Sequence, residues 1–287
     1  MTGATLPMPR RSSRRTAARV VTMMRGVTAL LISLLFFAPI YWMIMTAFKS
    51  GNEAFTATPS LFVWPSLENF ALVFTQSNFG LALSTSLFVA TTSTVLCLIL
   101  GASIAYPLGR IKMRGQKHIA FWILSLRIIP PIAVIIPLFL LLRSVGLTGS
   151  IWSLVIVYTY MNLPLTVWLL RGFFADLPPE IEEASFVDGA SRFRTFIGIT
   201  LPLTAPGFIA TGLLCFIFAW NEFLFANILT GAATRTAPVG LTEYVTPVSV
   251  EWNKIMAAGT LVVLPVWIGA LAVQRYLVRG LTMGAVK

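Results

Sequence analysis

The stretch of sequence that decides the fold is a polar segment between two apolar ones. Residues 176–194 read DLPPEIEEASFVDGASRFR and hold five of the ten acidic residues of the 287-residue chain. The runs on either side, 150–170 and 201–229, contain one charged residue between them, Glu222. Each run is long enough for a membrane-spanning helix, which needs roughly 20 residues. The polar segment is therefore predicted to connect two such helices outside the lipid.

Four further apolar runs of membrane length extend this pattern to the rest of the chain. They cover about 27–48, 83–108, 119–142 and 255–274, and only the run at 119–142 includes a charged residue, Arg127. Overall the chain is 57% hydrophobic and 11% charged, against roughly 25% charged residues in average globular proteins. This composition argues against a soluble protein and excludes a disordered chain. Because nearly every run also carries proline, which membrane helices tolerate, we expect an all-α membrane protein with six proline-bent transmembrane helices.

The basic residues set the orientation of these helices. The formal net charge is +11, and sixteen of the 21 Lys and Arg residues fall on one side of the predicted spans. Short cytoplasmic loops carry such an excess, so both termini are expected in the cytoplasm. The spread of charge over several loops excludes nucleic-acid binding, which requires one basic patch. The sixteen residues are Arg10, Arg11, Arg14, Arg15, Arg19, Arg25, Arg110, Lys112, Arg114, Lys117, Arg171, Arg192, Arg194, Arg275, Arg279 and Lys287.

The residues that commonly bind metals give no metal site. The two cysteines, Cys97 and Cys215, lie inside apolar runs without a paired spacing, and we interpret them as small core residues. The single histidine, His118, lies in a basic loop and is interpreted as solvated. The outer connections at 50–82 and 230–254 are long enough for a short interfacial helix and an ordered loop, respectively.

The polar segment is predicted to form a helix, a turn and a second helix. Pro178 and Pro179 suit the start of a helix, where a missing N–H costs nothing. The acids that follow are favoured by the helix dipole, and Gly189 suits the helix end. An acidic helix would be repelled by an anionic cytoplasmic leaflet. A protein partner with positive groups is therefore favoured over a helix that merely lies on the membrane.

The segment and the residues after it have a characteristic spacing: EAS at 183–185, then Gly189, Ile199 and LP at 201–202. This spacing resembles the EAA loop of ABC importer permeases, in particular those of the carbohydrate type, the family of the maltose and glycerol-phosphate importers. Three further stretches agree with this family: LENF at 67–70, WNEFLFA at 220–226 and RGLT at 279–282. One departure is a serine at 185 where the motif prefers alanine. The residues that carry the motif are Glu183, Ala184, Ser185, Asp188, Gly189, Ile199, Leu201 and Pro202.

This resemblance implies a type I ABC importer permease fold in a bacterial inner membrane. Residues 1–26 and 279–287 would be cytoplasmic tails around a six-span domain at 27–278, with the coupling loop at 176–200. The coupling helix would dock on a cytoplasmic ATPase dimer through Glu183. The implied assembly also contains a second homologous permease and an extracytoplasmic solute-binding protein. The loop at 230–254 of this chain is the expected docking surface for the binding protein. The chain has no phosphate-loop motif, so it is expected to be no enzyme and to bind no cofactor, with ATP and Mg used by the ATPase.

Four polar residues in the spans are candidates for a translocation pathway: Arg127, Asn162, Asn221 and Glu222. Each has a plainer interpretation. Long arginines snorkel toward the membrane surface, the glutamate is expected near the outer interface, and an asparagine often forms a hydrogen bond between helices. The sequence therefore leaves both interpretations open, a place in the translocation pathway and a structural role.

The resulting hypothesis is a permease subunit that moves a sugar, oligosaccharide or glycoside by alternating access. The same mechanism with a polyol, glycerol phosphate or osmolyte is the first alternative. A stand-alone secondary transporter is the second, and it would require an ion or proton relay within the membrane, for which only Arg127 and Glu222 are available. An intramembrane enzyme is disfavoured because the spans hold no acid, base or metal-ligand cluster.

Overall fold

The computed structural model describes residues 11–50, 62, 64–246 and 249–283, with side chains for those between 19 and 274. The ends of the predicted cytoplasmic tails, at 1–10 and 284–287, lie outside the described residues, as does most of 51–63 in the first outer connection.

Long apolar helices dominate the described part of the chain. Four helices are each long and apolar enough to cross a membrane, and two bent helix pairs bring the total to six if each pair counts as one span. This agrees with the six predicted spans. The four single helices are α1 (Arg11–Ala47), α3 (Phe79–Arg110), α6 (Ile151–Ala175) and α13 (Trp252–Met283).

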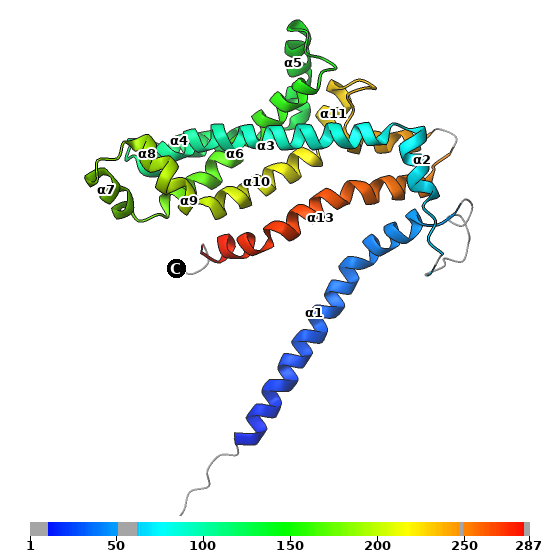
Figure 1. Cartoon of the computed structure of the whole chain (residues 1–287), viewed down its shortest axis with the longest axis horizontal. Helices are drawn as coiled ribbons and strands as arrows, with labels where there is room; N and C mark the ends of the chain where they lie inside the picture. The colour runs from blue at the N-terminus through cyan, green and yellow to red at the C-terminus, as the bar shows by residue number, and fades with distance from the viewer. Residues whose placement is uncertain (1–10, 51–61, 63, 247–248, 284–287) are drawn as a thin grey trace, which may run out of the picture.

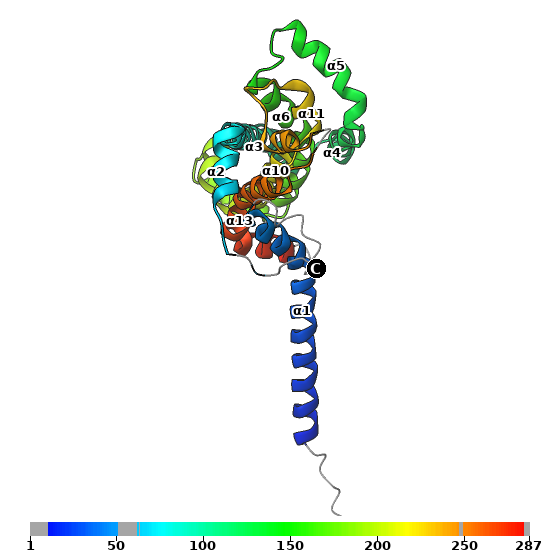
Figure 2. The ribbon, with the colours of Figure 1, turned by 90° about the vertical axis from the view of Figure 1, so that its right-hand side faces the viewer.

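The helices form a bundle from which one helix projects. Helix α3 packs along α6 and α10, and α13 lies against α10 (Figure 1). Helix α1 contacts α13 near its C-terminal end and extends away from the bundle, as the two views show (Figure 2). Most of α1 therefore presents an apolar surface that the rest of this chain does not cover.

The third predicted span is sharply broken. Residues 119–142 are predicted to form one proline-bent helix, and the bend is larger than that prediction implies: α4 (Gln116–Ser125) and the 3₁₀ turn η2 (Leu126–Ile128) meet α5 (Pro131–Ser144) at 87°. The cause is the proline pair at 130 and 131, because neither residue has an N–H to continue the helix and each restricts the residue before it. Arg127 lies in the last helical turn before the break.

The fifth predicted span, 201–229, also differs from one continuous helix. The segment formed by α8 (Arg192–Thr195), the π-helical turn η3 (Phe196–Thr200) and α9 (Leu201–Leu203) meets α10 (Ala205–Trp220) at 75°. Pro206 has no N–H to offer the preceding turn, which explains the bend. After α10, the chain turns at 221–223 and begins α11 (Leu224–Leu229).

The two connections that are predicted to lie outside the cell pack together, and both contain the ordered structure that the sequence predicts. Helix α2 (Glu68–Gln76) follows α1, and the Asn69 amide donates hydrogen bonds to the carbonyls of Ala47 (2.9 Å) and Lys49 (2.7 Å) at the end of α1. The loop at 230–254 contains α12 (Ala237–Gly240) and η4 (Leu241–Tyr244). Its buried Tyr244 hydroxyl forms a hydrogen bond with Ser77 just after α2.

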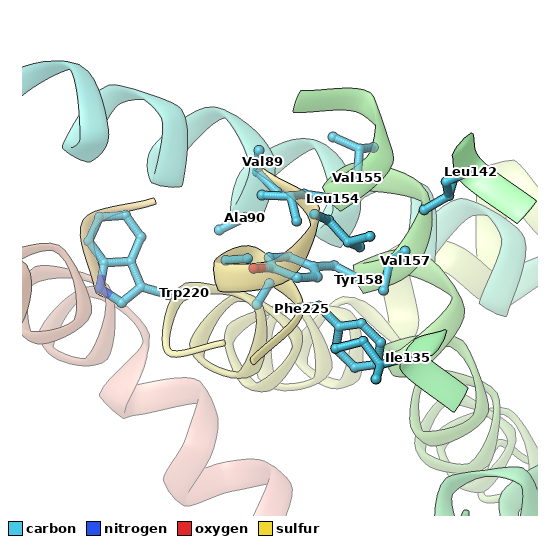
Figure 3. Close-up of a cluster of buried hydrophobic side chains, with 13 residues drawn as sticks. Val89, Ala90, Ile135, Leu142, Leu154, Val155, Val157, Tyr158, Trp220 and Phe225 are labelled. Carbon is cyan, nitrogen blue, oxygen red and sulfur yellow. The ribbon is translucent and has the colours of Figure 1, made fainter. Parts of the chain in front are cut away.

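The core lies between α3, α6 and α10, where small residues permit close approach. A Cβ added to Gly101 of α3 would lie 2.5 Å from the Thr166 side chain of α6, as expected for membrane helices that pack through small residues. Cys97 and Cys215 are both buried here, which confirms them as core residues. Aromatic side chains including Tyr158, Trp220 and Phe225 fill the adjoining cluster (Figure 3).

Candidate functional site

The predicted polar helix is present at one end of the bundle, between α6 and α8 (Figure 1). Helix α7 (Pro179–Val187) begins with proline in its first turn and carries Glu180 and Glu182 there. The chain turns at Gly189, whose φ of +81° falls in the left-handed region that glycine adopts without a steric penalty. The N–H groups of Gly189 and Ala190 donate to carbonyls in the last turn of α7, which ends the helix as predicted.

Two adjacent glutamates of α7 have opposite environments. Glu182 is 7% exposed, and its carboxylate accepts hydrogen bonds from Arg110 (2.8 Å) and Thr200 (2.7 Å). Glu183 is exposed, and it forms none of the ion pairs found among the described residues. The motif glutamate is thus the free carboxylate, and the buried one was missed by sequence reasoning because its arginine lies 72 residues away.

Most of the other motif residues are exposed, as Glu183 is. Ala184, Asp188, Gly189 and Pro202 are exposed, whereas Ile199 and Leu201 are partly buried. Large apolar side chains of α7 and α8 are exposed as well: Val187 is 88% and Phe193 is 76% exposed. We call this set of Glu183, Ala184, Val187, Asp188 and Phe193 the coupling surface. It combines acidic groups with large exposed apolar side chains, which is typical of a surface that binds another protein.

Ser185, the residue that departs from the motif, points inward. It is buried, and its hydroxyl forms a 2.9 Å hydrogen bond with the Thr195 hydroxyl of α8. The serine therefore joins the two short helices on either side of the Gly189 turn. A small residue is retained at this position, as close docking requires, and the added hydroxyl has a partner.

A second group of predicted residues meets in a cavity at the break of the third span. The cavity has a volume of about 220 Å³ and lies between the α4–α5 break, α6 and the end of α10. Three of the four predicted pathway residues contribute to its wall. Its lining residues are Arg127, Pro131, Tyr158, Met161, Asn162, Phe218, Ala219 and Glu222.

Glu222 is held in place by hydrogen bonds in this cavity. Its carboxylate accepts from the Tyr158 hydroxyl (2.9 Å) and from the N–H groups of Phe225 (2.9 Å) and Ala226 (3.1 Å) in α11. An acid that accepts hydrogen bonds from the first N–H groups of a helix caps the helix, and its negative charge interacts favourably with the helix dipole. Glu222 is therefore partly buried and stabilises the start of α11, which simple solvation of this acid would not require.

Arg127 and Asn162 keep hydrogen-bonding groups available in the cavity. The Arg127 guanidinium lies 4.5 Å from the centre of the Phe218 ring, in a cation–π contact. It takes part in none of the ion pairs among the described residues. Asn162 is 5% exposed and lines the cavity. By contrast, Asn221 does not line it; its side-chain amide donates to the Ile217 carbonyl on the exposed side of α10.

Comparison with known proteins decides the family. Residues 97–283 match the family model described as "Binding-protein-dependent transport system inner membrane component". The chain belongs to this family. The permease is 34% identical to the trehalose/maltose transport system permease protein MalG of Thermococcus litoralis, over 91% of this chain and 95% of that protein. It is also 33% identical to the sulfoquinovosyl glycerol transport system permease protein SmoH of Agrobacterium fabrum, over 91% and 92%.

A solved structure supports the fold of the permease independently. The chain aligns with a bacterial ABC transporter involved in the import of the acidic polysaccharide alginate, with a TM-score of 0.75 at 22% identity, over 94% of this chain and 99% of that one. The predicted permease fold is thereby confirmed, and the family model and the sequence relatives confirm the resemblance to ABC importer permeases. The permease is accordingly an inner-membrane component of a transport system.

The sequence gives no signal for Phe218 in the cavity or for the role of Arg110 beside α7. The sequence suggests for Tyr158 either stacking on a sugar ring or a place in the aromatic belt of the membrane interface, and its hydrogen bond to Glu222 is not predicted. Arg110 was counted only as an orientation charge. Each of the three gains its role from a partner in a distant helix, so spacing along the chain could not reveal it.

Proposed function

We propose that the permease is one transmembrane subunit of an ATP-driven importer that moves a carbohydrate by alternating access. Its relatives carry names that refer to trehalose/maltose, diacetylchitobiose and sulfoquinovosyl glycerol transport, and these names span neutral and acidic sugar compounds. The observation that carries the proposal is the coupling surface, an exposed acidic and apolar helix between two spans. Polyols, glycerol phosphate and osmolytes are the alternative solutes for the same mechanism.

The coupling surface would dock on a cytoplasmic ATPase dimer. Glu183 is exposed and unpaired among the described ion pairs, so its carboxylate is available to a basic group of the ATPase. Val187 and Phe193 beside it offer the apolar area that a cleft would bury. The permease carries no phosphate-loop motif, so ATP and Mg would be bound by the ATPase, and the permease itself would be no enzyme and bind no cofactor.

The cavity would form part of the pathway for the solute. Arg127 and Asn162 supply hydrogen-bond donors, and Asn162 supplies an acceptor, next to the Phe218 ring. Sugar hydroxyls require donors and acceptors of this kind, and the flat faces of sugar rings suit aromatic side chains. A second, homologous permease would close the open side of the pathway. The set formed by Arg127, Asn162 and Glu222 is the candidate solute contact, with Asn221 outside it.

The orientation proposed from the basic residues places both termini in the cytoplasm of a bacterial cell. The coupling surface then faces the cytoplasm, and the packed outer connections with α2 and the loop at 230–254 face the binding protein. One related solved structure is of a bacterial alginate ABC transporter in complex with a periplasmic protein bound to an alginate pentasaccharide, which supports a docking role for this surface.

Reconstitution tests the proposal. The permease is purified with its homologous partner and the ATPase, placed in liposomes, and exposed to the binding protein loaded with single sugars, polyols or glycerol phosphate. We expect ATP hydrolysis to rise several-fold with one class of carbohydrate. Stimulation by a polyol, glycerol phosphate or an osmolyte alone would support the alternative solute. Uptake driven by an ion gradient into liposomes that hold this chain alone would contradict the importer mechanism.

A further inference from the structure

A buried polar cluster connects the coupling surface to the membrane helices. We propose that Arg110, Glu182 and Thr200 are positioning residues that transmit displacement of α7 to α3 and to the segment before α10. The inference rests on the proposed function, since it concerns how docking of an ATPase would move the membrane helices. We call these three residues the transmission cluster.

The first half of the transmission cluster connects α7 to α3 and α6. Arg110 is the last residue of α3, and its Nε atom donates to Oε2 of Glu182 at 2.8 Å. Its Nη1 atom donates to the carbonyls of Leu177 (2.7 Å) and Phe174 (3.3 Å) at the end of α6. One guanidinium thus holds three segments together, and its planar set of donors makes that geometry directional.

The second half connects α7 to the bend before α10. The other carboxylate oxygen of Glu182 accepts a 2.7 Å hydrogen bond from the Thr200 hydroxyl. The Thr200 carbonyl in turn accepts from the Thr204 hydroxyl at 2.7 Å, and Thr204 lies at the 75° bend between α9 and α10. Glu182 therefore uses its two oxygens for two different membrane helices.

Helices α3 and α6 are closely packed beside the transmission cluster, and a cavity of about 340 Å³ lies on its other side, lined by Arg110 and Glu182. A Cβ added to Gly109, next to Arg110, would lie 2.9 Å from the Phe174 side chain and 3.1 Å from the Arg171 carbonyl oxygen. Both separations are shorter than ordinary contacts, so α3 and α6 already touch at this point. Since packed interiors shift between discrete arrangements and do not deform continuously, a displacement of α7 would move these helix ends together.

The ion pair between Arg110 and Glu182 makes the connection between α3 and α7 specific. Both side chains of the Arg110–Glu182 ion pair are 9% exposed, so solvent screens their attraction weakly. Loss of one partner would leave a buried charge without compensation. Glu183, the next residue, is exposed and free to meet a partner. The two adjacent acids of α7 therefore have different roles: Glu183 docks on the ATPase, and Glu182 transmits the displacement of α7.

The test measures the number of ATP molecules hydrolysed per solute imported, in liposomes holding the complete importer. We expect Glu182→Gln and Thr200→Val to raise this ratio at least about fivefold, the lower end of typical coupling factors, while the ATPase still co-purifies with the permease. Thr200→Ser, which keeps the hydroxyl, should restore the normal ratio. Glu180→Gln, an exposed acid of the same helix, is the matched control and should leave it unchanged.

The variants separate this inference from the proposed function. Glu183→Lys tests docking, and its loss of ATPase co-purification would support the proposed function without involving the transmission cluster. Thr200→Val keeps the test informative if Glu182→Gln fails to fold, because it removes one neutral hydroxyl. A normal ratio for both Glu182→Gln and Thr200→Val at normal expression would overturn the inference, and so would an altered ratio in Thr200→Ser equal to that in Thr200→Val.

Discussion

The transmission cluster and the cavity of this permease each contain an arginine and a glutamate, but in different arrangements. In the transmission cluster, Arg110 and Glu182 bind each other directly at 2.8 Å. In the cavity, Arg127 and Glu222 line the same wall, yet the arginine lies on a phenyl ring and the glutamate accepts from Tyr158 and two backbone N–H groups. An arginine whose charge is paired connects helices, whereas an arginine without an acid partner stays available to a ligand.

The largest expected effect removes the arginine of the transmission cluster. Arg110→Ala would leave Glu182 buried without its counter-ion, at a cost of about 3–5 kcal/mol in the free energy of unfolding. Arg127→Ala, the matched change in the cavity, would lose only a cation–π contact of about 0.5–1 kcal/mol. Thermal unfolding of the purified permease in detergent compares them. Equal decreases in melting temperature would contradict the distinction between the two arginines.

The cavity arginine should instead matter for transport. Arg127→Gln removes a charged donor from the pathway, and hydrogen bonds to charged groups contribute about 1.5–3 kcal/mol. We therefore expect solute uptake by the complete importer to fall roughly tenfold or more, with a nearly normal melting temperature. Uptake at the normal rate, measured in liposomes with the loaded binding protein, would remove Arg127 from the pathway. Asn221→Ala, outside the cavity, is the control and should transport normally.

A smaller effect concerns the turn that ends α7. Gly189→Ala forces a side chain into the left-handed region at φ +81°, which costs about 1–2 kcal/mol. Open space surrounds this position, so backbone strain alone accounts for the loss. Gly189→Asn should lose less, because asparagine tolerates this conformation better. A melting temperature that decreases equally for both variants would argue against the strained turn.

The smallest expected effect tests the departure from the motif. Ser185→Ala restores the alanine that the family motif prefers and leaves the Thr195 hydroxyl without its partner. The expected loss is about 1 kcal/mol of stability, with coupling unchanged because the residue remains small. Thr195→Val alone should destabilise to a similar extent. If the double variant lost the sum of both single effects, the hydrogen bond would have no role.

The sequence was sufficient for what depends on local patterns. Apolar length and proline content predicted six spans, and prolines, acids and Gly189 placed α7 and its end correctly. The 87° and 75° breaks were not predicted in size, because proline permits a bend while the packing of neighbouring helices sets its angle. The availability of Glu183 to a partner was predicted only from the resemblance to the EAA motif.

Pairings between distant residues could not be predicted. Glu182 and Arg110 lie 72 residues apart, and Tyr158 and Glu222 lie 64 residues apart, so each pair forms only once the two segments that carry it are packed together. Arg127, Asn162 and Glu222 were predicted as pathway residues and line one cavity, and their role in a pathway stays a prediction. Asn221 was included by its neighbourhood in sequence, but a turn of the chain at 221–223 directs it away from the cavity.

The measurement that tests the central claim most directly is ATP-driven uptake with the coupling surface reversed in charge. Liposomes containing the permease, its homologous partner and the ATPase are supplied with internal ATP and the loaded binding protein outside, and normal protein is compared with Glu183→Lys. We predict uptake that requires ATP and the ATPase and is lost in Glu183→Lys, while Glu180→Lys retains it. Equal uptake in Glu183→Lys and the normal permease would contradict the account.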